Sequence, residues 1–183
     1  MRVINSLLLL LSISSFFTGV LYSKTPYQGD LSLLLTRWSH YTVLTFATLY
    51  PFLFNKRYDL FYILFAIMLF LSWKLFNGEC PLSYLEKVYI DKNYKMGYDV
   101  TSHPYVDILA EDMSEVVWLV LGTQINLVFI YVVARYSFNN IKNPYIRYTN
   151  IAVAFGIFLY YSSYIVERIK KLRGYSPREK QLS

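Results

Sequence analysis

The sequence contains few of the residues on which disulfide scaffolds and metal centres depend. Of its 183 residues, one is Cys and two are His, and Asp, Glu, Lys and Arg together make up 16%. Soluble domains usually contain about 25% charged residues. A single Cys excludes an internal disulfide and a multi-cysteine metal site. The sequence also has no Gly-rich phosphate loop, no His-Glu-x-x-His motif and no Asn-x-Ser/Thr sequon, so no signature of nucleotide or zinc chemistry is present.

Apolar residues are abundant and are gathered in long blocks. They make up 55% of the chain, which excludes a disordered chain, a collagen-like chain and a disulfide scaffold. A bilayer core about 30 Å thick is crossed by about 20 apolar residues of helix, and no block shows the alternation of a barrel strand. We therefore predict an all-α, polytopic helical membrane protein, one integral, multi-pass membrane domain over residues 1–183. About five transmembrane helices are expected, in the hydrophobic segments 3–23, 31–55, 58–76, 114–135 and 146–166.

The first and third segments are the least typical of the five. Residues 3–23 resemble a signal peptide, but they lack a small-x-small cleavage site, so we expect an uncleaved anchor helix and keep the signal peptide as the alternative. The third segment has a short charge-free core, between Asp59 and Lys74, and Lys74 can extend its charge to the headgroups. The orientation stays open. The excess of cations favours a cytoplasmic loop and tail, whereas a signal-like first segment favours the opposite.

Two polar regions lie outside these segments. The loop 77–113 has seven acidic and three basic residues, and the tail 167–183 has six basic and two acidic residues. We expect the acidic loop, over residues 79–112, to contact a protein partner. The cations of residues 168–180 either bind anionic lipid or simply set the orientation of the chain. Because most cations flank the hydrophobic segments, we expect no binding of nucleic acid.

A short helix is predicted inside the loop. Asn77-Gly78 is a typical helix end, and Pro81 suits a first helical turn. Leu82, Leu85 and Tyr89 share one face of a helix over Pro81–Ile90, while Ser83, Glu86 and Lys87 point elsewhere. This amphipathic pattern favours an interfacial helix with its apolar face in the bilayer.

Cys80 begins the most distinctive stretch of the chain. A lone thiol at a membrane boundary is a packed, unreactive side chain, a lipidation site, or a nucleophile or metal ligand. The candidate catalytic residues are Cys80, Glu86 and His103, and no Cys–His spacing is visible nearby in the sequence. We predict no cofactor.

The remaining candidates are metal ligands and an ion pair. His103, Asp107 and Glu111 are spaced four residues apart and share one helical face. With either His40 or Glu115 they would form a mixed nitrogen and oxygen site for Zn, Mn or Fe. The alternative is that these carboxylates simply occupy the first turns of a helix, where its dipole favours them. Charges beside apolar spans need partners, so we expect a structural ion pair of Arg37 with Glu79 or Glu115.

The middle of the chain, about residues 38–135, resembles a family of small, uncharacterised bacterial membrane proteins that contain a domain of unknown function. In that family a Cys-Pro-Leu-Thr/Ser-x-x-Glu motif follows the second helix. The resemblance implies a helical membrane fold and no mechanism. The matching residues here are His40, Lys56-Arg57, Trp73, Cys80-Pro81-Leu82-Ser83 with Glu86, and Gly97-Tyr98.

Taken together, the sequence favours an integral membrane protein that works as a non-enzymatic scaffold or interaction protein. Two alternatives stay open. One is a small membrane-embedded enzyme acting at the bilayer interface, and the other is a transporter or channel subunit. The membrane in which it resides is not indicated.

Overall fold

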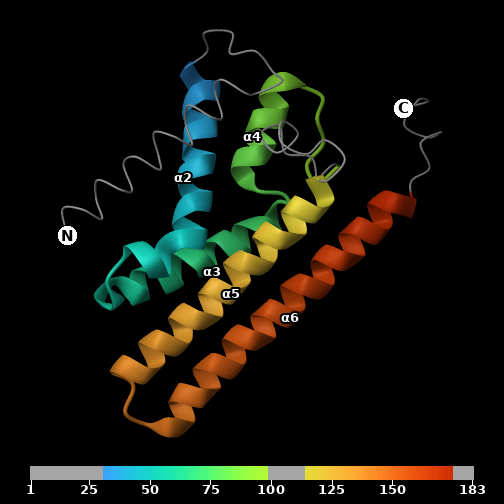
Figure 1. The fold of residues 1–183 in the computed structure, drawn as a ribbon. Coiled ribbons are helices and arrows are strands. Elements are labelled where there is room, and N and C mark those ends of the chain that lie inside the picture. The colour runs from blue at the N-terminus through green and yellow to red at the C-terminus, as the bar shows by residue number, and fades with distance from the viewer. Residues whose placement is uncertain (1–30, 99–113, 175–183) are drawn as a thin grey trace.

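The structure is a computed structural model that describes residues 31–98 and 114–174, and these residues form helices and no strand (Figure 1). The all-α class predicted from the sequence is therefore confirmed for this part of the chain. The segment 3–23 lies outside the described residues. The α-helices are α2 (Leu31–Leu53), α3 (Asp59–Leu75), α4 (Pro81–Ile90), α5 (Ser114–Asn140) and α6 (Pro144–Gly174), and a 3-10 helix, η1 (Lys56–Tyr58), joins α2 to α3.

The helix boundaries follow the hydrophobic segments, with two extensions at the C-terminal end. Helices α2 and α3 match the segments 31–55 and 58–76 closely, and the helix predicted over Pro81–Ile90 is confirmed as α4. Helix α5 continues past residue 135 to Asn140, and α6 continues past residue 166 to Gly174, into the region that the sequence marks as a basic tail. The last two helices are therefore longer than their apolar cores.

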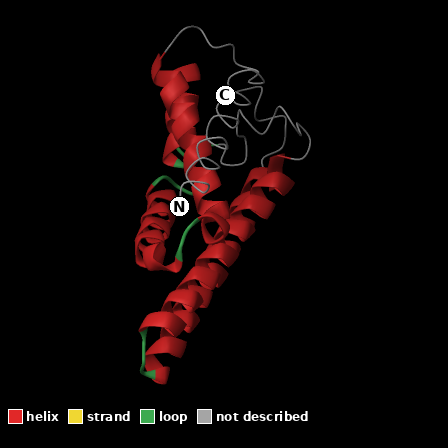
Figure 2. Cartoon of the chain, turned by 60° about the vertical axis from the view of Figure 1, so that its left-hand side comes forward, coloured by secondary structure: helices red, strands yellow, loops and turns green. Residues whose placement is uncertain are grey.

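Helix α5 lies at the centre of the described bundle. It packs against α2, α3 and α6, while α4 stands beside α2. Helices α5 and α6 form a long antiparallel hairpin that extends past the shorter helices at the end that carries its turn (Figures 1 and 2). The apolar core lies where α2, α3, α5 and α6 meet, and its largest members are Tyr50, Tyr62, Phe70, Ile125, Phe129 and Tyr161.

A proline near the end of α2 explains one buried tyrosine. Pro51 has no N–H, so the carbonyl of Ala47, four residues earlier, loses its normal helical donor. The hydroxyl of Tyr62 in α3 donates a hydrogen bond of 2.6 Å to this carbonyl, and both residues are buried. The contact satisfies a backbone acceptor that would otherwise be buried without a partner, and it joins the end of α2 to the start of α3.

A buried carboxylate joins α3 to α5. Asp59, fully buried at the start of α3, accepts hydrogen bonds of 2.9 and 2.6 Å from the guanidinium of Arg135. It also accepts a bond of 3.1 Å from the hydroxyl of Tyr50 in α2. Arg135 donates a further bond of 3.4 Å to the carbonyl of Pro51. One charge pair thus ties α2, α3 and α5 together at this end of the bundle.

We predict that Tyr62→Phe lowers the free energy of unfolding by about 1–3 kcal/mol, because the Ala47 carbonyl loses its donor. In a Pro51→Ala background residue 51 regains its N–H, which can donate to the same carbonyl. In that background Tyr62→Phe should lower the free energy of unfolding by clearly less than it does in the wild type. Denaturant unfolding of the four variants in one detergent measures this coupling. Equal costs of Tyr62→Phe in the two backgrounds would contradict the assigned role of Tyr62.

Candidate functional site: a buried polar cluster around Cys80

Six polar residues gather where α4 packs on α2, and we refer to them as the Cys80 cluster. All except Cys80 are buried, and Cys80 itself is partly exposed. Two of them belong to α2 and four to α4 or the turn before it. The members are Arg37, His40, Glu79, Cys80, Glu86 and Lys87.

The turn between α3 and α4 places Cys80 in the cluster. Asn77 and Gly78 both adopt positive φ, and the Gly78 N–H donates to the carbonyl of Trp73 at 2.7 Å. The Tyr164 ring of α6 packs against Gly78 so closely that a Cβ there would lie 3.1 Å from Tyr164 Cε1. Glycine is therefore required by conformation and by space. Cys80 follows as the residue before α4, and Pro81 occupies the first turn of that helix.

The imidazole of His40, in the middle of α2, acts electrostatically on the thiol of Cys80 at the start of α4. Burial by itself raises the pKa of the thiol, because it disfavours the charged thiolate. The nearby His40 imidazole acts against burial, and the backbone amides of Ser83 and Leu82 act in the same direction as His40. Together they lower the pKa of Cys80 to about 7.

Arg37 and Glu86 form a buried ion pair between α2 and α4. Arg37 Nε donates to Glu86 Oε1 at 2.6 Å, and the two side chains are only 3% and 1% exposed. The second carboxylate oxygen, Glu86 Oε2, is buried and has no hydrogen-bond partner among the described residues. Glu86 also acts electrostatically on His40, so its charge is felt by the Cys80–His40 pair.

Glu79 holds the far side of the cluster together. Its Oε1 accepts bonds of 2.8 Å from both Lys87 Nζ and the Tyr94 hydroxyl, and its Oε2 accepts one of 3.0 Å from the Gly97 N–H. Glu79 is fully buried, so these donors replace the water that the carboxylate loses. The carboxylate joins α4 to the chain after it, and a hydrogen-bonded charge of this kind is commonly structural.

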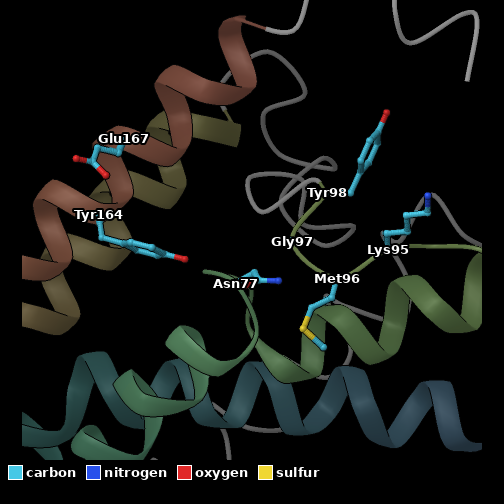
Figure 3. Close-up of a pocket in the computed structure, with 7 residues that line it drawn as sticks. All are labelled: Asn77, Lys95, Met96, Gly97, Tyr98, Tyr164 and Glu167. Carbon is cyan, nitrogen blue, oxygen red and sulfur yellow. The ribbon is translucent and has the colours of Figure 1, made fainter.

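A cavity of about 400 Å³ lies between α6 and the segment 95–98, which follows α4 (Figure 3). Tyr164 extends from α6 toward Asn77, while Lys95 and Tyr98 point away from α6. None of the residues that line the cavity belongs to the Cys80 cluster; they are Asn77, Lys95, Met96, Gly97, Tyr98, Tyr164 and Glu167. The Gly97 amide nevertheless links the two, since it bonds to Glu79.

The structure brings together some of the residues singled out in the sequence and separates others. Cys80 and Glu86 lie in one cluster. Arg37 forms an ion pair, but its partner is Glu86 and not Glu79, because Glu79 is engaged by Lys87 eight residues along the same segment. His103, Asp107 and Glu111 lie outside the described residues, as does the side chain of Glu115. Nothing in the structure bears on the metal set that they would form.

Two features of the cluster were not visible in the sequence. His40 and Cys80 are forty positions apart, so only the packing of α2 on α4 makes them neighbours. Lys87 was expected only to lie off the apolar face of the short helix, and the structure buries it against Glu79. The one available signal for the Cys–His pair was that both residues belong to the set on which the family resemblance rests. Among the described residues no group of three or more His, Cys, Asp or Glu is placed to hold a metal.

Comparisons of the chain with family models, with curated proteins and with solved structures gave no match.

We predict that Arg37→Met destabilises the protein by about 3–5 kcal/mol, because it leaves the buried Glu86 carboxylate without its partner. The double variant Arg37→Met, Glu86→Met should recover most of this loss, since an apolar pair has no charge to bury. Lys56→Met is the matched control, because Lys56 is exposed and donates only to Asn139. Lys56→Met should lower the free energy of unfolding by no more than about 1 kcal/mol. Denaturant unfolding in detergent measures all three variants, and a double variant as unstable as Arg37→Met would refute the pairing.

Proposed function

We propose that the protein is a multi-pass integral membrane protein that acts through its surfaces, as a scaffold or interaction protein. The observation that carries the proposal is the distribution of side chains in the described bundle. Its interior contains paired charges such as Arg37–Glu86 and Asp59–Arg135. Its exterior carries large apolar side chains, among them Phe52, Met68 and Leu75 at 79%, 72% and 76% exposure. Extensive exposed apolar surface indicates an apolar environment or a partner.

The two most apolar helices support the same proposal. Among the described residues, Lys56–Leu75 and Leu119–Asn140 are long and apolar enough to cross a membrane. Only 22% and 33% of their most apolar windows are buried inside the structure. A core helix of a soluble protein is mostly buried, so these helices direct most of their apolar surface outward. Lipid is the environment in which that surface is stable.

Polar contacts mark two levels about one bilayer apart. At one end Lys56 donates to Asn139 at 3.0 Å, which places the α2–α3 turn beside the end of α5. At the other end Lys74 donates to the Tyr160 hydroxyl at 2.8 Å, and the Tyr164 ring covers Gly78. The nineteen residues 148–166 of α6 are free of charge, and at 1.5 Å per residue they span about 28 Å. This length suits a bilayer core.

This arrangement supports five crossings with the loop and the tail on one side. The last turn of α3 contacts α6 through Lys74 and Tyr160, and the α2–α3 turn contacts the last turn of α5 through Lys56 and Asn139. The segment 3–23, outside the described residues, supplies the fifth crossing of the proposal. We further infer a protein partner at residues 79–112 and anionic lipid at residues 168–180. We also propose that the chain belongs to the uncharacterised bacterial family whose motif it resembles.

The enzyme alternative has one specific observation in its favour, the lowered pKa of the Cys80 thiol beside the His40 imidazole. The transporter or channel alternative has none of comparable weight, because the buried charges in the described bundle are neutralised in pairs.

We predict that the protein stays in the membrane fraction after alkaline carbonate extraction. Reporter tags inserted after Asn93 and after Ser183 should become accessible to protease from the same face. A tag in the turn 141–143 should be accessible from the opposite face, and it serves as the internal control. Release by carbonate would contradict membrane integration, and tags after Asn93 and Ser183 on opposite faces would contradict the five-crossing arrangement.

A further inference from the structure

We propose that the end of the bundle that carries the α5–α6 turn binds the headgroups of anionic phospholipids, through three cations that we call the basic patch. The patch consists of Lys56 in η1, Lys142 in the turn between α5 and α6, and Arg147 in the first turn of α6. The inference rests on the membrane location proposed above. It concerns the leaflet opposite the loop and the tail, and thus a different surface from residues 168–180.

Hydrogen bonds bring the three cations to one turn of the chain. Lys56 Nζ donates to the side-chain oxygen of Asn139 at 3.0 Å, so η1 lies against the last turn of α5. Arg147 donates from Nε and Nη2 to the carbonyl of Ile141 at 3.3 and 2.9 Å, which holds its guanidinium beside the residue that precedes Lys142. The basic patch therefore surrounds the α5–α6 turn, at the end of the long hairpin (Figure 1).

The partners of these cations are neutral, whereas the cations of the three buried ion pairs are each bonded to a carboxylate. Lys56 is bonded to an amide oxygen, and Arg147 to a carbonyl oxygen. The Arg147 guanidinium also lies 4.9 Å from the centre of the Phe138 ring. Neutral partners orient a cation without cancelling its charge, and these bonds occupy only some of its donors. The patch therefore presents oriented positive charge and N–H groups to an anion.

The described chain supplies no carboxylate for the patch. Asp59 is the only Asp or Glu within residues 41–78 and 116–166, and it is fully buried and bonded to Arg135. Arg57, which lies 4.5 Å from the centre of the Tyr58 ring, adds positive charge next to Lys56. Charge complementarity therefore favours a ligand that is itself anionic.

Exposed aromatic side chains indicate that the patch lies at the depth of lipid phosphates. Phe138 is in the last turn of α5, Tyr145 and Tyr148 are in the first two turns of α6, and all three are exposed. Tyrosine is enriched where a membrane meets water. Arg147 directly precedes the charge-free stretch 148–166, so the patch begins where the apolar span ends. Basic residues next to a span attract anionic headgroups, and this position favours a lipid over a soluble anion.

The test measures which lipid lies beside the patch in phosphatidylcholine nanodiscs. The full chain carries Cys80→Ser and Tyr145→Cys, and the thiol at position 145 is labelled with the fluorophore bimane. A small fraction of the lipid, either phosphatidylglycerol or phosphatidylcholine, carries the same doxyl quencher on its acyl chain. Phosphatidylglycerol should quench about fivefold more strongly at equal mole fraction, the factor expected for one cation near a membrane surface. High salt should reduce this excess, because it screens exposed charges.

Lys56→Gln together with Lys142→Gln should remove most of the excess. Lys92→Gln together with Lys95→Gln is the matched control, because it removes the same charge from exposed positions after α4, and it should leave the excess unchanged. An equal loss in the control overturns the patch, since net charge then accounts for the effect. Equal quenching by the two lipids in the chain with an intact patch also overturns it, while the membrane location stands. No quenching by either lipid overturns the membrane location, and the inference with it.

Discussion

A charge placed between apolar helices must be neutralised by a partner in direct contact, and the described structure is organised around this constraint. Three buried carboxylates meet three cations: Glu86 with Arg37, Glu79 with Lys87 and Asp59 with Arg135. The first pair holds α4 on α2, and the third holds α3 on α5. Because an unpaired charge in the interior costs several kcal/mol, each pair permits only a narrow range of helix positions. The pairs therefore specify how the helices are aligned, more than they add to stability.

The same constraint explains the orientation of α4. Ser83, Glu86 and Lys87 occupy its inner face, while Leu85, Tyr89 and Ile90 are exposed. A helix on a soluble protein has the opposite arrangement, with its apolar face inward. An inner polar face is favourable when the outside is more apolar than the inside. Within the proposed membrane, α4 thus carries its charges into the bundle and its apolar face toward lipid, and this places Cys80 beside His40.

Much of the fold could be predicted from the sequence, because long charge-free runs have few alternatives to a helix. The bounds of α2, α3 and α4 followed from such runs and from Gly78 and Pro81. The ends of α5 and α6 did not, because their last turns are polar and continue as helix beyond the apolar core. Hydropathy identifies the apolar part of a helix but does not predict how far the helix continues through polar residues.

The candidate site was harder to predict, because it depends on contacts between helices. The sequence singled out Arg37, Cys80 and Glu86 as candidates. More than one acidic residue could have paired with Arg37, and the need for an opposite charge does not select among them. The choice of Glu86 follows from which face of α4 meets α2. The hydrogen bond from Tyr62 to the Ala47 carbonyl, which Pro51 leaves without a helical donor, likewise depends on how two helices pack. Periodicity along one chain cannot specify the pairing of two distant segments.

The central claim, that α4 has a polar inner face and an apolar face toward lipid, is tested most directly by spin labels in lipid nanodiscs. In a Cys80→Ser background, a label at Leu85 should be accessible to oxygen, which concentrates in lipid, and protected from a water-soluble nickel complex. A label at Asn93, in the turn after α4, should show the reverse. A label at Leu85 that the nickel complex reaches as readily as the one at Asn93 would contradict the claim.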